Sequence, residues 1–251
     1  MPAGDELRAF LARMLGWSNE RAVDLALRSL ALALDHRAAL VLCGEDDLVP
    51  IAWALHRHML GADRPFIVCD PRRGTKAASV RSPASRASGV AAFEAAIGGS
   101  LCVRSRRLPS DFPALVARLR DADDVLCAIC TAAVADPRSP LVLPAPLAVP
   151  PLSQRSAELD RIIAEYASDA IEELAAPASS FTAGDHAWVR GHAAASLADI
   201  EKATLRVVAI RTSRNLSGAA ARLGMAVVSL SRWLGRRTLP PITFSDHGIH
   251  R

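Results

Sequence analysis

Cysteine side chains offer the clearest opportunity for metal or redox chemistry in this sequence. Cys127 and Cys130 form a C-x-x-C pattern within the apolar run VLCAIC. A structural zinc site needs a second pair of ligands at suitable spacing, and none follows. A redox pair would normally open a helix, whereas this pair lies inside a strand-like segment. All five cysteines lie in or at the end of apolar runs and are expected to be buried free thiols: Cys43, Cys69, Cys102, Cys127 and Cys130.

No other combination of side chains predicts an active site. His56 and His58 are two residues apart in a predicted helix, so their side chains diverge and a shared metal is not expected. The acidic residues Asp121, Asp123 and Asp124 precede a strand and are typical of a solvated turn. The sequence has no G-x-S-x-G nucleophile elbow. We therefore expect no enzyme activity, no metal and no cofactor.

The positive charge is concentrated at the C-terminal end of the chain. Residues 201–251 contain nine Lys or Arg against two Asp or Glu, a net charge of +7. Residues 1–200 contain 21 against 24, a net charge of −3. A basic segment attached to a nearly neutral body is typical of a nucleic-acid-binding region. Aromatic residues make up only 4% of the chain, which argues against a surface that stacks the bases of single strands.

The basic segment contains two short helical patterns separated by a glycine. In NLSGAAARLGM (215–225), Asn215 or Ser217 can cap the first helix, and its alanines allow a second helix to pack closely. Gly224 ends this helix, and Met225 is expected to fill the core beneath the turn. A second helix is predicted at about 226–236. The two together predict a helix-turn-helix.

The second of these helices divides into an apolar and a polar side. Val227, Leu230 and Leu234 are spaced at i, i+3 and i+7, which predicts one buried face. Short polar and arginine side chains on the other side suit base edges and phosphates. Arg211, Arg214 and Arg222 are candidates for phosphate contacts. The residues expected to contact DNA are Arg214, Ser217, Arg222, Val227, Val228, Ser229, Ser231, Arg232, Arg236 and Arg237. The alternative is a basic helical hairpin that contacts protein.

The rest of the chain must position these residues, and it begins with alternating strands and helices. Continuous apolar runs predict buried strands within 39–47, 65–71, 100–103 and 125–131. Helical spacing predicts helices at 5–16, 19–35, 48–60, 89–99 and 111–122, with Ser18-Asn19 capping the second and Ser110 the last. This alternation indicates a parallel sheet covered on both faces.

The intervening segments differ in composition. Residues 72–88 are polar, basic and small, and predict an exposed flexible loop. Residues 132–151 are rich in Pro and Ala and predict a linker. Beyond residue 152 only helices are expected, at about 155–175, 183–195, 197–212, 217–223 and 226–236.

The helix-turn-helix pattern resembles a known family. The pattern N-x-S-x-A-A-x-x-L-G at 215–224, followed by S-L-x-R-W-L at 229–234, is similar to the Fis-type helix-turn-helix of bacterial enhancer-binding proteins, the sigma-54-dependent activators. The body resembles the same family in order. Residues 44–51 resemble the family's phosphate loop GETGTGKE, and residues 64–70 resemble its GPF and N-C segment. Residues 89–103 resemble the family's G-x-F-E-x-A-x-G-G-T-L-F-L segment, and residues 151–159 resemble its P-L-R-E-R-x-x-D-I. The resemblance covers about residues 20 to 240.

Departures from the family pattern imply that its ATP chemistry is lost. Val49-Pro50 stands where the family has Gly-Lys, which removes the phosphate-binding lysine and one backbone donor. Arg104-Ser105 stands where the family has the Asp-Glu pair that holds magnesium and activates water. The residues of this degenerate nucleotide site are Gly44, Val49, Pro50, Arg104, Ser105 and Arg155.

Other family features are absent too. Ala198 replaces the sensor arginine of the lid. Of two arginines that act on a neighbouring subunit, Arg155 remains and Ser153 replaces the other. The sigma-contacting G-A-F-T-G-A loop is missing, and residues 72–88 stand in its region.

The expected fold is therefore an α/β, AAA+-like parallel-sheet domain (1–150), a helical lid (151–195) and an all-α Fis-type helix-turn-helix (196–251). The expected function is sequence-specific DNA binding in transcription regulation, with double-stranded DNA as partner and a homodimer or higher oligomer. One alternative is a non-catalytic adaptor that pairs with an active AAA+ relative or another protein. A further alternative is a nucleotide sensor without hydrolysis.

The N-terminal segment and the hydropathy indicate the cellular location of the protein. MPAGDELRAFLARMLG carries charges throughout, so it is not expected to be a signal peptide. No run of 18 uncharged apolar residues occurs. We therefore expect a cytoplasmic protein without a membrane partner.

Overall fold

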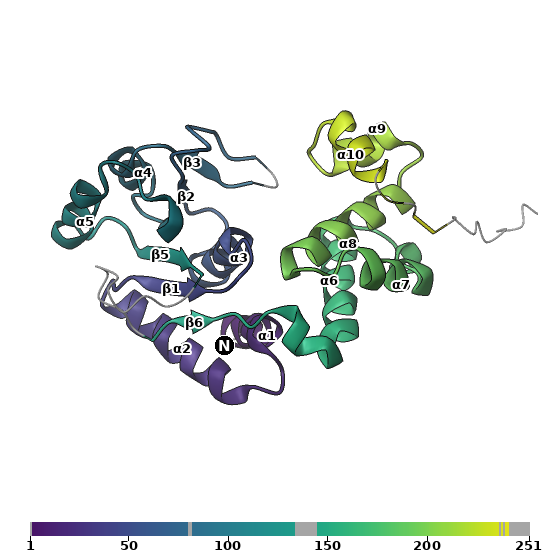
Figure 1. Ribbon diagram of the computed structural model, residues 1–251, viewed down its shortest axis with the longest axis horizontal. Helices are drawn as coiled ribbons and strands as arrows, with labels where there is room; N and C mark the ends of the chain where they lie inside the picture. Colours follow the sequence, from purple (N-terminus) through teal and green to yellow (C-terminus); the bar gives the residue numbers. More distant parts are fainter. Residues whose placement is uncertain (1, 80–81, 134–144, 236, 238, 241–251) are drawn as a thin grey trace, which may run out of the picture. The chain divides into compact units, whose positions relative to one another are not determined.

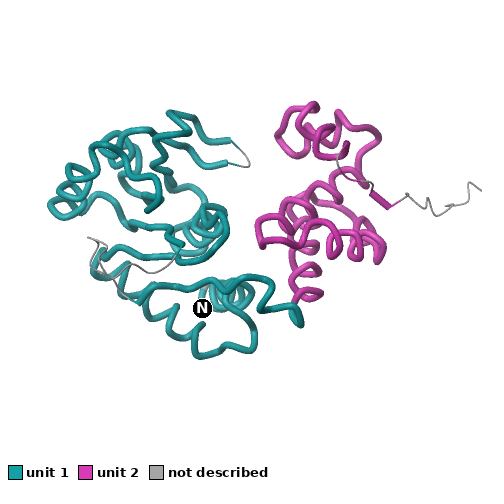
Figure 2. The backbone as a smooth tube through the Cα atoms, viewed as in Figure 1, with its two compact units in different colours: residues 1–158 teal, residues 159–251 magenta. Residues whose placement is uncertain are grey.

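The computed structural model describes residues 2–79, 82–133, 145–235, 237 and 239–240. It divides into two compact units, Met1–Glu158 and Leu159–Arg251 (Figure 2). Among the described residues, no helix combines the length and the apolar character needed to cross a membrane. The predicted contact of Arg236 with DNA lies outside the described residues.

A parallel sheet forms the centre of the first unit (Figure 1). Its described strands are β1 (Leu40–Cys43), β2 (Phe66–Cys69), β3 (Ala84–Arg86), β4 (Ser100–Arg104), β5 (Cys127–Ala132) and β6 (Leu147–Ala148), in the order β3-β2-β4-β5-β1-β6. Every pair is parallel, with registers such as Phe66 beside Ser100 and Leu40 beside Ile129. The continuous apolar runs form these strands because both faces of the sheet are covered. The predicted α/β class is confirmed.

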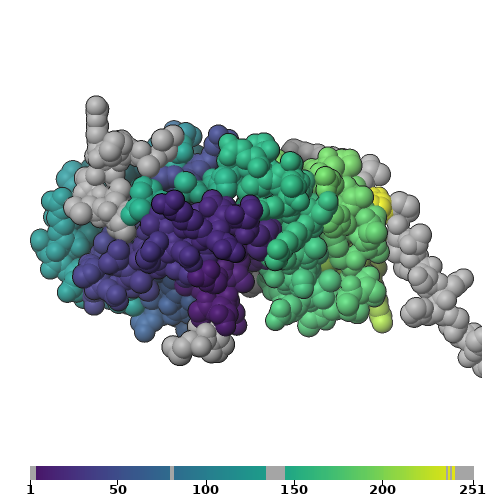
Figure 3. Space-filling model, turned by 90° about the horizontal axis from the view of Figure 1, so that it is seen from below, coloured from purple at the N-terminus to yellow at the C-terminus, as the bar shows by residue number. Residues whose placement is uncertain are grey.

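Helices pack on both faces of this sheet. The helices of the unit are α1 (Pro2–Leu15), α2 (Glu20–Asp35), α3 (Val49–Leu60), α4 (Gly89–Ala95) and α5 (Phe112–Asp121). Leu101 and Val103 of β4 share a core with Phe93 of α4 and Leu115 of α5. Ser100 points to the opposite face, where it meets His56 of α3. In the view of Figure 3, residues 4–35 of α1 and α2 cover the nearest part of the unit.

Two strands lie in segments where the sequence predicted none. Part of the predicted flexible loop 72–88 is the edge strand β3, whose Ser85 pairs with Val68 of β2. Ser85 is 3% exposed, and its Oγ donates to the carbonyl of Gly74 at 2.9 Å. Within the predicted linker 132–151, β6 pairs with β1, and the N–H of Val149 donates to the carbonyl of Cys43. Both expectations were wrong at these residues because backbone pairing with a formed sheet outweighs their polar or proline-rich composition.

The helix caps agree with the sequence at one position and differ at another. The side chain of Asn19 accepts from the N–H of Ala22 and caps α2, as predicted. The prediction that Ser110 caps α5 was wrong, because Asp111 is the N-cap residue and makes no cap bond there. The Asp111 carboxylate instead accepts from the N–H groups of Gly89 and Val90 at the start of α4. These bonds lower the pKa of Asp111 to about 2.

The described residues of the second unit form helices joined by turns, with no strand among them. A short 3₁₀ segment at the end of the first unit (Leu152–Glu158) precedes the helices α6 (Leu159–Glu173), α7 (Ala183–His192), α8 (Leu197–Arg211), α9 (Leu216–Arg222) and α10 (Val227–Leu234). Ala170 and Leu174 near the end of α6 share one core with Val208 of α8 and Leu230 of α10. Helices assigned from the sequence to a lid (151–195) and to a separate DNA-binding domain (196–251) therefore pack as one unit after residue 158.

Candidate functional site

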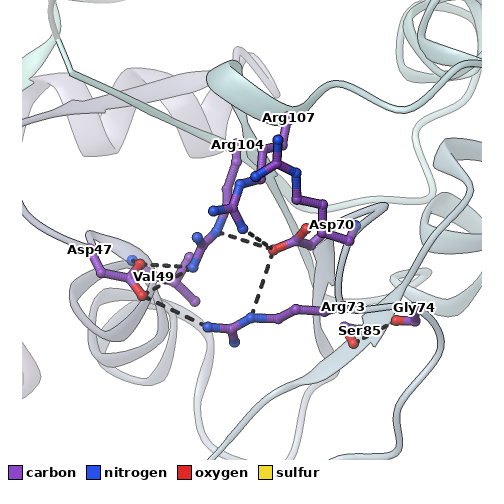
Figure 4. Close-up of polar contacts among 9 residues, drawn as sticks. Asp47, Val49, Asp70, Arg73, Gly74, Ser85, Arg104 and Arg107 are labelled. Carbon is purple, nitrogen blue, oxygen red and sulfur yellow. Dashed lines mark hydrogen bonds and ion pairs between the residues drawn. The ribbon is translucent and has the colours of Figure 1, made fainter.

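Charged residues gather where the strands of the first unit end. Asp47 lies in the loop after β1, Asp70 directly follows β2, and Arg104 is the last residue of β4. The carboxyl ends of parallel strands share one edge of the sheet, which is where open α/β sheets usually bind ligands. This edge is therefore the candidate site of the unit, and Figure 4 shows its side chains.

Asp47 and Arg104 form the centre of this cluster. The Nη2 atom of Arg104 lies 2.8 Å from Oδ1 and 3.1 Å from Oδ2 of Asp47. Oδ1 of Asp47 also accepts from the N–H of Val49 at 3.2 Å, in the first turn of α3. A carboxylate at this end of a helix interacts favourably with the helix dipole. The anion at the start of α3 is thus a side chain of the chain itself, and its counter-ion is Arg104 (Figure 4).

Asp70 forms a second, buried centre beside the first. Its side chain is fully buried, and its Oδ2 lies 3.4 Å from Nη1 of Arg107 and 3.7 Å from Nε of Arg104. Arg73 contributes a third guanidinium, 3.7 Å from the same oxygen and 4.0 Å from Oδ2 of Asp47. Three arginines therefore surround two carboxylates (Figure 4). These guanidinium groups replace part of the hydration that the Asp70 carboxyl group loses on burial.

The open space at this edge is small. A hollow of about 170 Å³ lies between the loop 44–48, the arginines at and just after the end of β4, and residues 131–133 around the end of β5. Ligand pockets usually have volumes of about 300–1,000 Å³. A Cβ added to Gly44 would lie 3.1 Å from the side chain of Leu48 and 3.3 Å from the carbonyl of Val149. The loop after β1 is therefore packed against its own neighbours, Leu48 and Val149.

The structure brings together some of the residues predicted for the degenerate nucleotide site. Gly44, Val49, Pro50 and Arg104 lie together at the start of α3 and the end of β4, whereas Ser105 is exposed in the turn that follows. Arg155 lies elsewhere in the unit. It is 6% exposed and donates to the carbonyls of Arg13 and Met14 and to the carboxylate of Glu158. Arg155 therefore fixes the end of α1.

The residues considered for metal or redox chemistry have structural surroundings. His56 is 1% exposed, with Nδ1 2.8 Å from Oγ of Ser100 and Nε2 3.1 Å from the carbonyl of Arg64. Burial lowers its pKa. All five cysteines are buried and free, and burial raises the pKa of Cys127 to about 12 and that of Cys130 to about 11. Three positions apart on a strand, this pair points to opposite faces of the sheet.

The second unit contains the predicted pair of short helices. The side chain of Asn215 caps α9 by accepting from the N–H of Gly218 at 2.8 Å. Gly224 follows α9 with a φ of +60°, a conformation that favours glycine. Met225 packs against the shared core, as predicted. Four residues separate α9 from α10. This length fits the turn of about 3–4 residues in helix-turn-helix motifs.

Helix α10 has a buried and an exposed side. Leu230 is fully buried, and Trp233 and Leu234 are half-buried beside it. The expectation that Val227 is buried was wrong, because it is 42% exposed and Val228 is 54% exposed. The full set of exposed residues is Val227, Val228, Ser229, Ser231 and Arg232. They cover a continuous arc because consecutive helix residues are rotated by about 100°.

Two arginines considered for phosphate contacts have partners inside the unit. Arg211 is bound to the fully buried Asp185, with Nη2 2.6 Å from Oδ1, and also donates to the carbonyl of Pro240. Arg222 donates to Oγ1 of Thr212 at 2.6 Å and to the carbonyl of Leu174. The buried carboxylate of Asp185 holds the Arg211 guanidinium, which argues against a phosphate contact by this residue. DNA contacts by Arg211 and Arg222 stay predictions.

The remaining predicted contacts lie on the surface of this unit. Arg214 and Ser217 are exposed at the start of α9. Arg237 is half-buried with its guanidinium 5.3 Å from the ring centre of Trp233, and Arg206 stacks on the same ring at 5.1 Å. Burial and the nearby charge of Arg237 lower the pKa of Arg206. Both guanidinium groups make cation–π contacts with the ring of Trp233.

Sequence reasoning missed Asp70, Arg73, Arg107 and Asp111. Asp70 carried a usable pattern, because it directly follows a buried apolar run (FIVC), where sheet-edge residues are expected. Asp111 had no comparable pattern, since its partners are backbone groups 21 and 22 residues away.

This chain is similar to solved structures at low sequence identity. No protein-family model matches this chain, and no curated protein matches it. A crystal structure of NtrX from Brucella abortus in complex with ATP has 14% sequence identity and a TM-score of 0.46, and the match covers 86% of this chain and 67% of that one. A second crystal structure of NtrX from Brucella abortus has 13% identity and a TM-score of 0.43, with 86% and 68% covered.

Proposed function

We propose that this protein is a sequence-specific DNA-binding regulator of transcription whose α/β unit does not hydrolyse nucleotides. The observation that carries the proposal is the exposed arc of α10, in which Ser229, Ser231 and Arg232 face outward while Leu230 is fully buried. A recognition helix needs such a division, because one side must be held by its scaffold and the other must reach bases.

The geometry around α10 supports the same function. Helix α9 is capped at Asn215, ends at a glycine turn and packs against α10 through Ala219, Ala220 and Leu230. This arrangement presents the outer side of α10 without burying it. The net charge of +7 over residues 201–251 favours a polyanionic partner. Arg214 and Arg232 are exposed and are proposed to contact phosphates.

The charged edge of the α/β unit supports the absence of hydrolysis. Nucleotide hydrolysis of the AAA+ type needs a phosphate-binding lysine and a magnesium site. At the corresponding positions the chain has Val49-Pro50 and Arg104, and the Asp47 carboxylate already accepts from the backbone at the start of α3. A triphosphate would have to displace Asp47 and meet its negative charge. The residues present therefore do not fit a magnesium–ATP complex.

Dimerisation belongs to the proposal as well. The resemblance to enhancer-binding proteins implies a dimer that binds palindromic sites, and two copies of α10 would then read two half-sites about 34–36 Å apart. Each copy would contribute one arc of exposed residues.

The proposal is tested by selecting bound sequences from a random duplex pool with the full chain. A conserved motif is expected after several rounds, with an inverted repeat if the chain binds as a dimer. The variant Arg232→Ala should lower the recovery of this motif, whereas Arg118→Ala, an exposed arginine of α5, should leave it unchanged. Recovery of unrelated sequences only would overturn sequence-specific binding. Millimolar ATP with magnesium should not raise the melting temperature, and a clear rise would favour a nucleotide sensor instead.

A second candidate function is a non-catalytic adaptor that contacts another protein. Leu25 and Leu32 of α2 favour it, because they are 44% and 49% exposed and lie two turns apart on one side of the helix. Under this function, the unchanged protein would not bind duplex DNA at low salt. Replacing both leucines by glutamate would abolish assembly with the partner. Unchanged assembly of this double variant would rule these two leucines out as the contact surface, and binding to duplex DNA with no assembly at all would rule the adaptor function out.

A further inference from the structure

Two neighbouring valines are exposed at the start of α10. Val227 and Val228 are 42% and 54% exposed, and they are the two exposed large apolar side chains among the described residues of the helical unit. Exposure of an apolar side chain to water is unfavourable, and two in succession form a small apolar patch. The patch needs an explanation because Leu230, two residues further along, is fully buried in the same short helix.

The valines share their side of the helix with side chains suited to DNA. Val228, Ser231 and Arg232 are spaced at i, i+3 and i+4 and are all exposed, so they lie next to one another on the surface. Val227 lies beside Ser231 at i and i+4. An arginine able to bind a phosphate or a guanine edge is thus one helical turn from the apolar patch. The patch lies within the surface proposed to face the major groove.

Charge favours duplex DNA over a second copy of this chain as the occupant. Residues 201–251 carry a net charge of +7, so pairing this surface with itself would bring like charges together. Two valines also offer far less apolar area than a stable protein interface, which buries about 1,200–2,000 Å² in total. A polyanion with a small apolar feature suits the surface better.

The major groove of DNA has one apolar group that matches the patch. Thymine carries a C5-methyl group there, beside its O4 acceptor, and the other bases offer donors and acceptors. In helix-turn-helix proteins the first residues of the recognition helix contact base edges, and Val227 and Val228 are the first two residues of α10. The β-branched side chains have restricted χ1 rotation, so little conformational freedom is lost on contact.

We propose that Val227 and Val228 determine base specificity by packing against thymine C5-methyl groups in the major groove. This inference rests on the proposed function. The valines would select thymine, and Arg232 would make the neighbouring polar contact with the DNA.

The test compares thymine with deoxyuridine, which keeps every hydrogen-bonding group and lacks only the methyl. The full chain is titrated with the duplex recovered by selection, and each thymine of the motif is replaced in turn. At one or two positions per half-site the affinity should fall by about fourfold, the value expected for one buried methyl. At the remaining thymines it should not change.

Variants connect the effect to the valines. The double variant Val227→Ser and Val228→Ser should bind thymine and deoxyuridine duplexes with equal affinity. Ile97→Ser, which changes a 49% exposed apolar residue of the α/β unit, should retain the discrimination. Melting temperatures of the variants verify that each is folded.

The outcomes separate this inference from the proposed function. Absence of binding to any duplex overturns the proposed function, and the inference with it. Binding to the selected duplex without loss at any deoxyuridine overturns the inference alone. It is also overturned if the discrimination persists in the valine double variant, or if that variant changes only the oligomeric state.

Discussion

The guanidinium of Arg104 binds the carboxylate of Asp47, with its Nη2 2.8 Å from Oδ1 and 3.1 Å from Oδ2. This pair joins the end of β4 to the loop after β1, two segments that are 57 residues apart. The same arginine lies 3.7 Å from the fully buried Asp70. Arg104 thereby contacts both carboxylates at this edge of the sheet, and Arg73 and Arg107 supply the further positive charge.

Replacing Arg104 should therefore destabilise the α/β unit. We expect Arg104→Ala to lower the free energy of unfolding by about 1–3 kcal/mol, because Asp70 stays buried with fewer counter-charges. Arg106→Ala, which changes an exposed neighbour, is the control and should have a small effect of about 0.5 kcal/mol or less. Urea unfolding measures both. Equal stability of Arg104→Ala and the unchanged protein would contradict a structural role for this cluster.

His56 should make stability depend on pH. Burial lowers its pKa below the ordinary value of 6.5, so the unfolded chain binds a proton more readily than the folded one. Stability from this residue is then full above about pH 6.5 and decreases as the pH falls below that value. We expect His56→Asn to show a flatter dependence of melting temperature on pH across this window. His36→Asn, at an exposed position, should keep the original dependence, and the same slope in both variants would refute the prediction.

Arg211 is expected to stabilise the helical unit rather than to bind DNA. It is 9% exposed and pairs with Asp185, which is fully buried and also forms the capping box of α7 with Thr182. Arg211→Ala should cost about 3–5 kcal/mol, because the carboxylate would remain buried without its partner. Arg161→Ala, from an exposed pair with Glu165 one helical turn away, should cost about 0.5 kcal/mol or less.

The effect on DNA separates the two roles of Arg211. At a temperature where Arg211→Ala is folded, the salt dependence of DNA binding should equal that of the unchanged protein. A shallower dependence would mean that Arg211 contacts a phosphate.

The main elements of the fold could be predicted because their sequences are locally distinctive. LVLC and FIVC can only be buried, and they form β1 and β2. Strand β3 was missed because its sequence ASR has no apolar pattern, and it is held by backbone pairing with β2 and by the bond from Ser85 to Gly74. Strand β6 was missed because its two residues lie among prolines.

Features of the sites that depend on adjacent residues could be predicted, and those that depend on distant residues could not. The cap at Asn215 and the turn at Gly224 depend on adjacent residues, so the sequence indicated both. The ion pairs of Asp70 depend on which strands are neighbours, and the spacing of residues does not contain that information. Val227 was expected to be buried from its spacing to Leu230, but α10 begins at this residue and leaves it exposed.

DNA recognition by α10 is tested by titrating a fluorescent duplex of the selected sequence with the full chain at several salt concentrations. We expect log affinity to fall linearly with log salt, and Arg232→Ala to make the slope shallower by about 0.9 for the one phosphate contact removed. Arg118→Ala should leave the slope unchanged. No binding at low salt, or the same affinity and slope for Arg232→Ala and the unchanged protein, would contradict DNA recognition by α10.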